Sequence, residues 1–206
     1  MSGFPLLRAL VYLAVTVLLS GCSRTEESMA LPGPVTTAAG GFPLALQMQA
    51  REAPGTCLVR VLVVLDRDST EFKVSKIVYG FAPILSGSRS YSVTVDNATH
   101  RAAGTNDTQG AQGIPGPERL PVSLAGKDVW EVLQIAKESG LNDFCAFVSP
   151  GHESILFQLE SPDVGPVWHI TADGWDPVRG TVLLRIDIDA GSGAVTRRDF
   201  RVTPKR

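Results

Sequence analysis

Apolar and polar residues alternate most clearly in residues 181–189, near the end of the chain. Every second residue from Val182 to Ile188 is apolar, and most residues between them are polar. A period of two predicts a β-strand with one covered face and one largely wet face, as in an antiparallel sheet. Shorter apolar runs separated by Pro, Gly and Asp predict further strands. These runs cover residues 144–148, 154–160 and 167–171.

Helical periodicity precedes these strands, in residues 123–139. Four apolar residues are spaced there at i, i+3, i+4 and i+7, which places them on one face of a helix. Ser123 is available as an N-terminal cap, and Gly140 follows the last turn as a stop signal. The four apolar residues are Val129, Val132, Leu133 and Ala136.

The first half of the chain repeats this order more weakly. Residues 42–53 have partial helical spacing, and three strand-like runs follow, at residues 57–65, 73–82 and 90–96. Residues 101–121 are rich in Gly, Ala, Asn, Gln and Pro and have no core-forming pattern, which predicts a linker.

The expected fold class is therefore α+β, with two units that each combine a helix with an antiparallel sheet. The units span residues 42–100 and 122–206, and their order favours an internal duplication. The alternative left open is a single irregular sheet domain.

An apolar segment near the N-terminus predicts a targeting signal. Residues 9–19 are almost unbroken apolar, shorter than the roughly 20 residues that a membrane-spanning helix needs. Leu19-Ser20-Gly21-Cys22 follows. This motif resembles the lipobox of bacterial lipoproteins, which implies removal of residues 1–21 and acylation of Cys22 with two or three chains, a stable anchor. The alternative is an ordinary secretory signal peptide whose cleavage site lies near Cys22 by chance.

The resemblance also implies a location. The expected protein is anchored to the bacterial cell envelope and faces the periplasm. Ser23 rather than Asp follows the cysteine, which favours the outer over the inner membrane. Residues 22–41 lack apolar periodicity and are expected to be a flexible tether.

Composition excludes several classes of protein. The chain has 206 residues, with 19 Lys and Arg against 21 Asp and Glu, for a net charge of −2. This balance disfavours a nucleic-acid binder or a polybasic membrane binder. The single apolar run at the N-terminus also excludes a multi-pass membrane protein.

If Cys22 is acylated, two of the three cysteines remain as thiols. Cys57 and Cys145 lie in a compartment that permits disulfides, so we predict that they pair. Both flank apolar, strand-like runs, so two buried thiols that behave as small hydrophobes are the other interpretation.

The C-terminal unit resembles a PepSY-type domain. The resemblance covers residues 122–195 and rests on Gln134-Ile135-Ala136, on Trp168-His169-Ile170 and on the closing residues 188–195. The family ends approximately in Val-Asp-Ala-x-Thr-Gly-x-Val, and Ser192 replaces the Thr here. The resemblance implies an extracytoplasmic, non-enzymatic domain that binds envelope partners.

The closing residues also have a physical interpretation of their own. Asp189 can accept hydrogen bonds from turn amides, and Gly193 can adopt a positive φ, so the strand can reverse there.

The search for chemistry gives no catalytic residue, no metal site and no cofactor motif. The three histidines are scattered, and no phosphate loop, Gly-x-Ser-x-Gly or dinucleotide fingerprint is present. By strand parity His169 falls on the wet face, as do Asp187 and Arg185. Trp175 lies in a turn, either as an exposed anchor for a partner or folded over the sheet edge.

We therefore expect a non-enzymatic periplasmic lipoprotein. Its anchor is the lipid bilayer through Cys22, and its candidate contact surface comprises His169, Trp175, Arg185 and Asp187. The expected partner is an envelope protein or peptide, with no nucleic acid involved. A small-ligand sensor and, less favoured, an envelope hydrolase are the alternatives.

Overall fold

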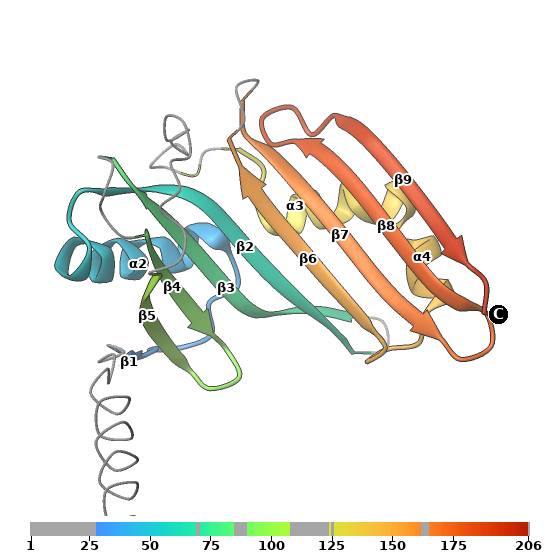
Figure 1. Cartoon of the computed structure of the whole chain (residues 1–206), viewed down its shortest axis with the longest axis horizontal. Helices are drawn as coiled ribbons and strands as arrows, with labels where there is room; N and C mark the ends of the chain where they lie inside the picture. The colour runs from blue at the N-terminus through green and yellow to red at the C-terminus, as the bar shows by residue number, and fades with distance from the viewer. Residues whose placement is uncertain are drawn as a thin grey trace, which may run out of the picture.

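The structure is a computed structural model that describes residues 28–68, 71–84, 90–107, 124, 126–161 and 165–205. Cys22 and the proposed signal peptide lie outside the described residues. Figure 1 shows a broad twisted sheet with the helices behind it. The sheet has nine strands in the order β1-β5-β4-β3-β2-β6-β7-β8-β9. All eight neighbouring pairs are antiparallel.

Within its described residues, the first half of the chain supplies one helix and five strands. The helix is α2 (Ala38–Glu52), and the strands are β1 (Ser28–Ala30), β2 (Thr56–Asp68), β3 (Glu71–Pro83), β4 (Ser90–Asp96) and β5 (Arg101–Asp107). The second half supplies a broken helical segment and four strands. These are α3 (Val129–Ala136), a π-helical turn η1 (Lys137–Leu141), α4 (Asn142–Phe147), β6 (Glu153–Glu160), β7 (Val167–Asp176), β8 (Gly180–Asp189) and β9 (Val195–Thr203).

The expected fold class was wrong. The chain does not form two α+β units with separate sheets, because β2 and β6 pair along six residues each and join all strands into one mainly β structure. The alternative of a single sheet domain describes the molecule. Pairing β2 with β6 removes two exposed strand edges at once, and unpaired edges are costly and prone to association.

Several local expectations also differ from the structure. Residues 22–41, expected as a flexible tether, contain β1 and the first turn of α2. Arg101–Asp107, expected to begin a linker, forms β5 instead. Residues 144–148, expected as a strand, lie in and just after α4. The structure caps α3 with Asp128, whose carboxylate accepts from the amides of Trp130 and Glu131 in a capping box, and Ser123 lies outside the described residues.

Gly140 does not end the helical segment but bends it. Its φ of 125° breaks the helical path between α3 and α4, a conformation that glycine adopts without steric cost. The predicted turn after β8 is confirmed, because Asp189 accepts from the amide and hydroxyl of Ser192, each at 2.7 Å. Gly193 has a φ of 78° there.

The core lies between the sheet and the helices. Helix α2 places Phe42, Ala45 and Met48 against the first half of the sheet, and α3 buries Val132 and Leu133 against the second. Trp168 of β7 is 1% exposed. One face of the sheet is therefore sealed, and the other is left for solvent or a partner.

Two polar side chains fasten the helices to distant strands. Tyr79 of β3 donates from its hydroxyl to the carbonyl of Ala38 at 2.5 Å. Arg67 of β2 donates to Glu153 and to the carbonyls of Cys145 and Val148, at the end of α4. Helix positions thus depend on contacts between segments far apart in the sequence.

The open face of the sheet as a candidate binding site

Strand register sorts the side chains onto two faces. Along β6, for example, Ile155 and Phe157 are fully buried under the helices. The alternate residues Leu156 and Gln158 are half-buried and face the other way. We call this second side the open face, because no element of the described part of the chain covers it. Figure 1 views the molecule from this side.

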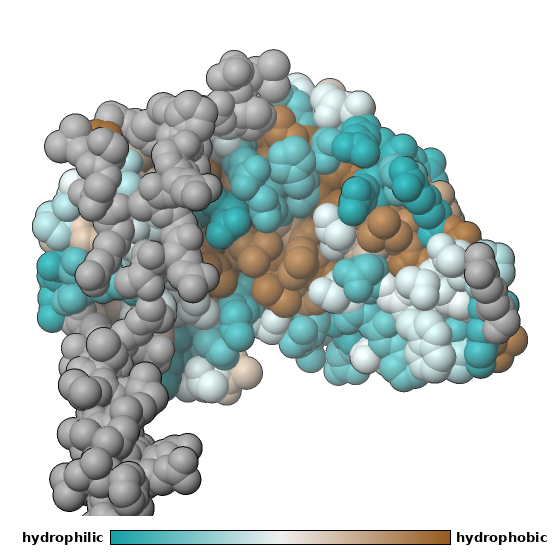
Figure 2. All heavy atoms as spheres, viewed as in Figure 1, coloured by the Kyte–Doolittle hydropathy of each residue, from teal (hydrophilic) through white to brown (hydrophobic). Residues whose placement is uncertain are grey.

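The centre of the open face is apolar. Leu62 and Val64 of β2 stand between Val78 of β3 and Leu156 of β6, since the register pairs Leu62 with Val78 and Val64 with Leu156. All four side chains are half-buried rather than sealed. Figure 2 shows this hydrophobic area over the middle of the sheet, with hydrophilic side chains around it. We call these four residues the apolar patch.

Charged side chains border the apolar patch on one side. Arg60 of β2 pairs in register with Glu160 of β6, and the Glu160 carboxylate accepts from the Gln158 amide at 2.6 Å. A Cβ on Gly80 would lie 3.6 Å from the Cβ of Arg60, so the arginine stem crosses the bare backbone of β3. Opposite charges on adjacent strands attract and fix the register.

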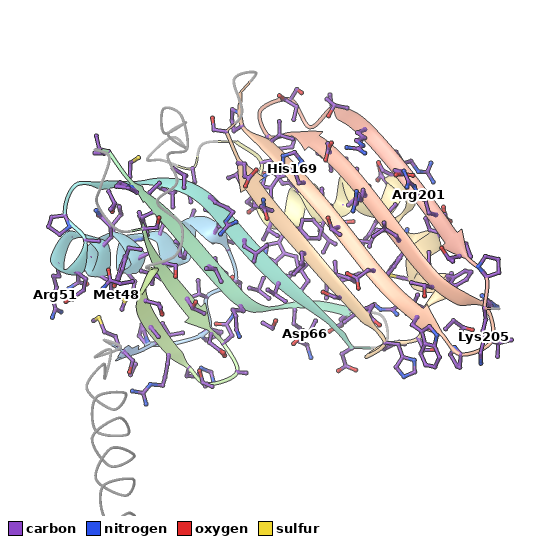
Figure 3. The ribbon with its side chains drawn as sticks, in the orientation of Figure 1. Met48, Arg51, Asp66, His169, Arg201 and Lys205 are labelled. Carbon is purple, nitrogen blue, oxygen red and sulfur yellow. The ribbon has the colours of Figure 1, made fainter. Side chains whose placement is uncertain are left out.

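His169 and Asp187 meet on the open face, as strand parity predicted. Nδ1 of His169 lies 2.8 Å from Oδ1 of Asp187, and the two side chains are 37% and 22% exposed. Arg185 is the next outward residue of β8 and is exposed. Figure 3 shows His169 near one end of β7, with Arg201 on β9 beyond it and Asp66 at the far end of β2.

Asp199 organises the arginines at the edge of this face. Arg201 donates to its carboxylate, and this hydrogen bond, followed by the charges of Arg201, Arg197 and Arg185, lowers the pKa of Asp199 below its ordinary value. The register sets Arg185 directly opposite Asp199. Asp199 and Asp187, which lies opposite Arg197, offset two of the three arginines, so this edge is not a strongly basic patch.

Trp175 lies on the same face but apart from the other three predicted contact residues. It is 48% exposed, and its ring centroid is 6.1 Å from that of His152. It belongs to β7, close to the turn where that strand ends. The indole is therefore accessible, although it lies four positions along β7 from Thr171, the residue that pairs with Leu156 of the apolar patch.

The predicted disulfide between Cys57 and Cys145 is absent, and both thiols are free. Cys57 lies at the start of β2, whereas the Cys145 carbonyl accepts a hydrogen bond from Arg67 near the other end of the same strand. Ten residues of strand separate those ends by about 33 Å. A disulfide requires Cα atoms within about 7 Å, so the fold rules this pairing out.

The three histidines do not converge. His100 lies in the turn after β4, His152 precedes β6, and His169 lies within β7. Within the described ranges, no group of three or more His, Cys, Asp or Glu side chains is placed to hold a metal ion. The absence of a catalytic site remains a prediction.

Sequence reasoning missed the apolar patch. Its signal was present in residues 57–65, where apolar residues occupy both strand parities instead of alternating with polar ones. Such runs are typical of strands covered on both faces. Strand β2 therefore has the composition of a doubly covered strand, although helices cover only one of its faces.

Comparison with known proteins adds little. No protein-family profile matches the chain, so its PepSY-like resemblance remains a prediction, and no curated protein matches it. Among solved structures, the crystal structure of a "putative lipoprotein" from Clostridium difficile 630 aligns at 12% identity with a TM-score of 0.44. The alignment covers 76% of this chain and 90% of that chain. Similarity at this level carries no conclusion about the family or function of this protein.

Proposed function

We propose that this protein is a lipid-anchored, non-enzymatic protein of the bacterial cell envelope that binds a protein partner through the open face of its sheet. The anchor is Cys22, and the contact surface is the apolar patch with its charged border. His169, Asp187 and Arg185 belong to that border, and Trp175 is a peripheral contact.

The proposed anchor rests on the motif Leu19-Ser20-Gly21-Cys22. In the described part of the chain, no helix has the length and apolar character needed to cross a bilayer. Two or three acyl chains on one cysteine bind a membrane stably, whereas a single chain binds only marginally.

The observation that carries the binding function is the exposure of apolar side chains at the centre of a sheet. The outer face of an antiparallel sheet is normally polar. Here Leu62, Val64, Val78 and Leu156 are half-buried and contiguous on that face. Contiguous apolar patches with a polar border mark interaction sites.

The charges around the patch favour a protein as its occupant. Lys76 lies 3.5 Å from Asp96, His169 pairs with Asp187, and Arg60 faces Glu160 across adjacent strands. Both signs alternate, so the border offers no net attraction to a polyanion such as nucleic acid. Mixed charges around an apolar centre fit a protein surface with complementary pairs.

Photo-crosslinking in native envelopes tests the binding face. A photoreactive residue at position 156 is expected to give a discrete adduct, and one at position 203 on β9 is not. Leu62→Glu, which places a carboxylate in the patch, is expected to abolish the adduct. Val178→Glu is the control, because Val178 is 84% exposed and away from the patch. An adduct that survives Leu62→Glu in a folded protein would reject the open face.

Metabolic labelling tests the anchor separately. Cells fed a fatty-acid probe are expected to label the wild-type protein, and Cys22→Ser is expected to lose both the label and the membrane fraction. An unlabelled wild-type protein would reject lipid anchoring while leaving the binding face to its own test.

A further inference from the structure

Strand β1 shortens the chain between the proposed anchor and the folded domain. Ser28, Met29 and Ala30 pair with Ala103, Ala102 and Arg101 of β5. The guanidinium of Arg101 also donates to the Ser28 hydroxyl. The following residue, Leu31, is buried and donates from its amide to the His100 carbonyl at 2.9 Å. The sheet therefore begins at Ser28, well inside the segment expected as a tether.

Only residues 23–27 separate Cys22 from Ser28. Six residue steps reach at most about 20 Å, whereas the nineteen steps to residue 41 would have reached about 65 Å. Across the sheet, nine strands give eight spacings between β1 and β9, which amounts to about 38 Å. The reach of the chain is thus about half the width of the sheet.

From this geometry we infer that the β1–β5 edge of the sheet faces the lipid headgroups and that β9 is the distal edge. This inference rests on the lipid anchor of the proposed function. A reach of about 20 Å cannot hold the β9 edge at the bilayer while the β1 edge points away, because that arrangement needs about 38 Å.

The chemistry of the membrane-facing edge suits headgroups. At one end of this edge, the β4–β5 turn residues Ala98, Thr99 and His100 and the first residue of β5, Arg101, are exposed. The neighbouring carboxylate of Asp96 is occupied, because it accepts from the amides of Ala98 and Thr99 and lies 3.5 Å from Lys76. This end of the edge therefore presents Arg101 among small and polar groups, which water and headgroups accommodate.

A flat orientation on the open face is less favourable. It would bring three carboxylates and three guanidinium groups toward the headgroups, all from outward positions of β7 to β9, so it would gain no net attraction to anionic headgroups. These residues are Asp173, Asp187, Asp199, Arg185, Arg197 and Arg201. An upright sheet keeps these groups in water. It also leaves the apolar patch accessible, because the open face then runs away from the membrane.

The upright orientation restricts the partner. β2 lies four strand spacings from β1, or about 19 Å. Adding the reach of the chain places the apolar patch within about 40 Å of the bilayer. The partner of the open face is therefore a protein that presents its binding surface close to the same membrane.

Energy transfer to labelled lipids tests this orientation. The full, acylated chain is reconstituted into vesicles of phosphatidylethanolamine and phosphatidylglycerol that carry an acceptor dye on the headgroups. A donor is attached at Thr99→Cys, in the exposed turn between β4 and β5, or at Thr203→Cys, exposed at the end of β9, in a chain with Cys57→Ala and Cys145→Ala. Because six to seven strand spacings separate position 99 from β9, or about 30 Å, transfer is expected to be at least about twofold greater from position 99.

A longer tether is the matched control. Inserting about fifteen Gly and Ser residues between Thr25 and Ser28 lets the domain tumble, so the difference between the two positions is expected to disappear. Circular dichroism verifies that each labelled variant is folded. Equal transfer from both positions with the native tether, or greater transfer from position 203, would overturn the orientation without affecting the anchor. Failure of Cys22→Ser to release the protein from vesicles would instead overturn the anchor and this inference with it.

Discussion

The ion pair between Arg67 and Glu153 provides a quantitative test of the fold. The two side chains are 6% and 4% exposed, and Nε of Arg67 lies 2.9 Å from Oε1 of Glu153. The same guanidinium donates to the carbonyls of Cys145 at 3.0 Å and Val148 at 2.5 Å. Carbonyls at a helix end have no partner within the helix. Arg67 thus links α4 to β2 and donates to three acceptors, the Glu153 carboxylate and the carbonyls of Cys145 and Val148.

Replacing Arg67 with Met preserves most of the apolar stem but leaves Glu153 charged, buried and without its guanidinium partner. Removing one member of a buried pair costs about 3–5 kcal/mol. We expect Arg67→Met to lower the free energy of unfolding by this amount. The assay is urea denaturation of the chain from Ser23, followed by circular dichroism and Trp fluorescence. Arg60→Met, an exposed arginine of the same strand, should cost less than about 0.5 kcal/mol.

The double variant distinguishes pairing from simple packing. Removing both charges in Arg67→Met/Glu153→Leu also removes the unpaired carboxylate, so the double variant should be more stable than Arg67→Met by about 1 kcal/mol or more. If the double variant loses the sum of the two single losses, the side chains act independently and the reasoning is refuted.

Three further predictions concern the packing, the cooperativity and the thiols. A Cβ on Gly41 would lie 2.5 Å from the Tyr79 hydroxyl, so Gly41→Ala should lose about 1–3 kcal/mol in urea denaturation despite the better helix propensity of Ala. A smaller loss in a Tyr79→Phe background would confirm the clash, and an equal loss would contradict it. Because β2 and β6 join the halves, calorimetry should show one unfolding transition, with calorimetric and van't Hoff enthalpies that agree; two transitions would contradict the single sheet. The denatured, unreduced chain from Ser23 should titrate two free thiols, Cys57 and Cys145, whereas a disulfide would leave none. In the folded protein Cys145 should react slowly at pH 8 and faster as pH rises, because burial raises the pKa of its thiol and leaves little thiolate.

Local pattern was enough to predict several features of this protein. The alternation in residues 181–189 corresponds to β8, and the spacing from Val129 to Ala136 corresponds to α3. Asp189 and Gly193 form the turn that their side chains favour. In each case the interactions that determine the strand, helix or turn lie within a few residues of one another, so the local sequence pattern predicts it. Strand parity likewise placed His169, Asp187 and Arg185 on one face.

Short apolar runs were ambiguous without their neighbours. Residues 144–148 are compatible with a strand or with a buried helix turn, because periodicity alone does not separate the two over five residues. The structure makes them helical, with Phe144 and Val148 buried four residues apart. In this helical segment Cys145 lies beside Arg67, at the opposite end of β2 from Cys57, so the predicted disulfide does not form.

The arrangement of the sheet was decided by tertiary structure alone. The pairings of β2 with β6 and of β1 with β5 join segments far apart in the chain. The local sequence of a strand does not determine which other strand it pairs with. The pairing of β2 with β6 merges the halves into one sheet and forms the apolar patch across β3, β2 and β6. The pairing of β1 with β5 starts the sheet at Ser28, six residues after Cys22 in the sequence. What the sequence determined by itself is the proposed lipid address, a cluster of outward charges and most of the individual strands. Which strands are neighbours depends on the free energy of burying edges and faces together, a property of the whole fold.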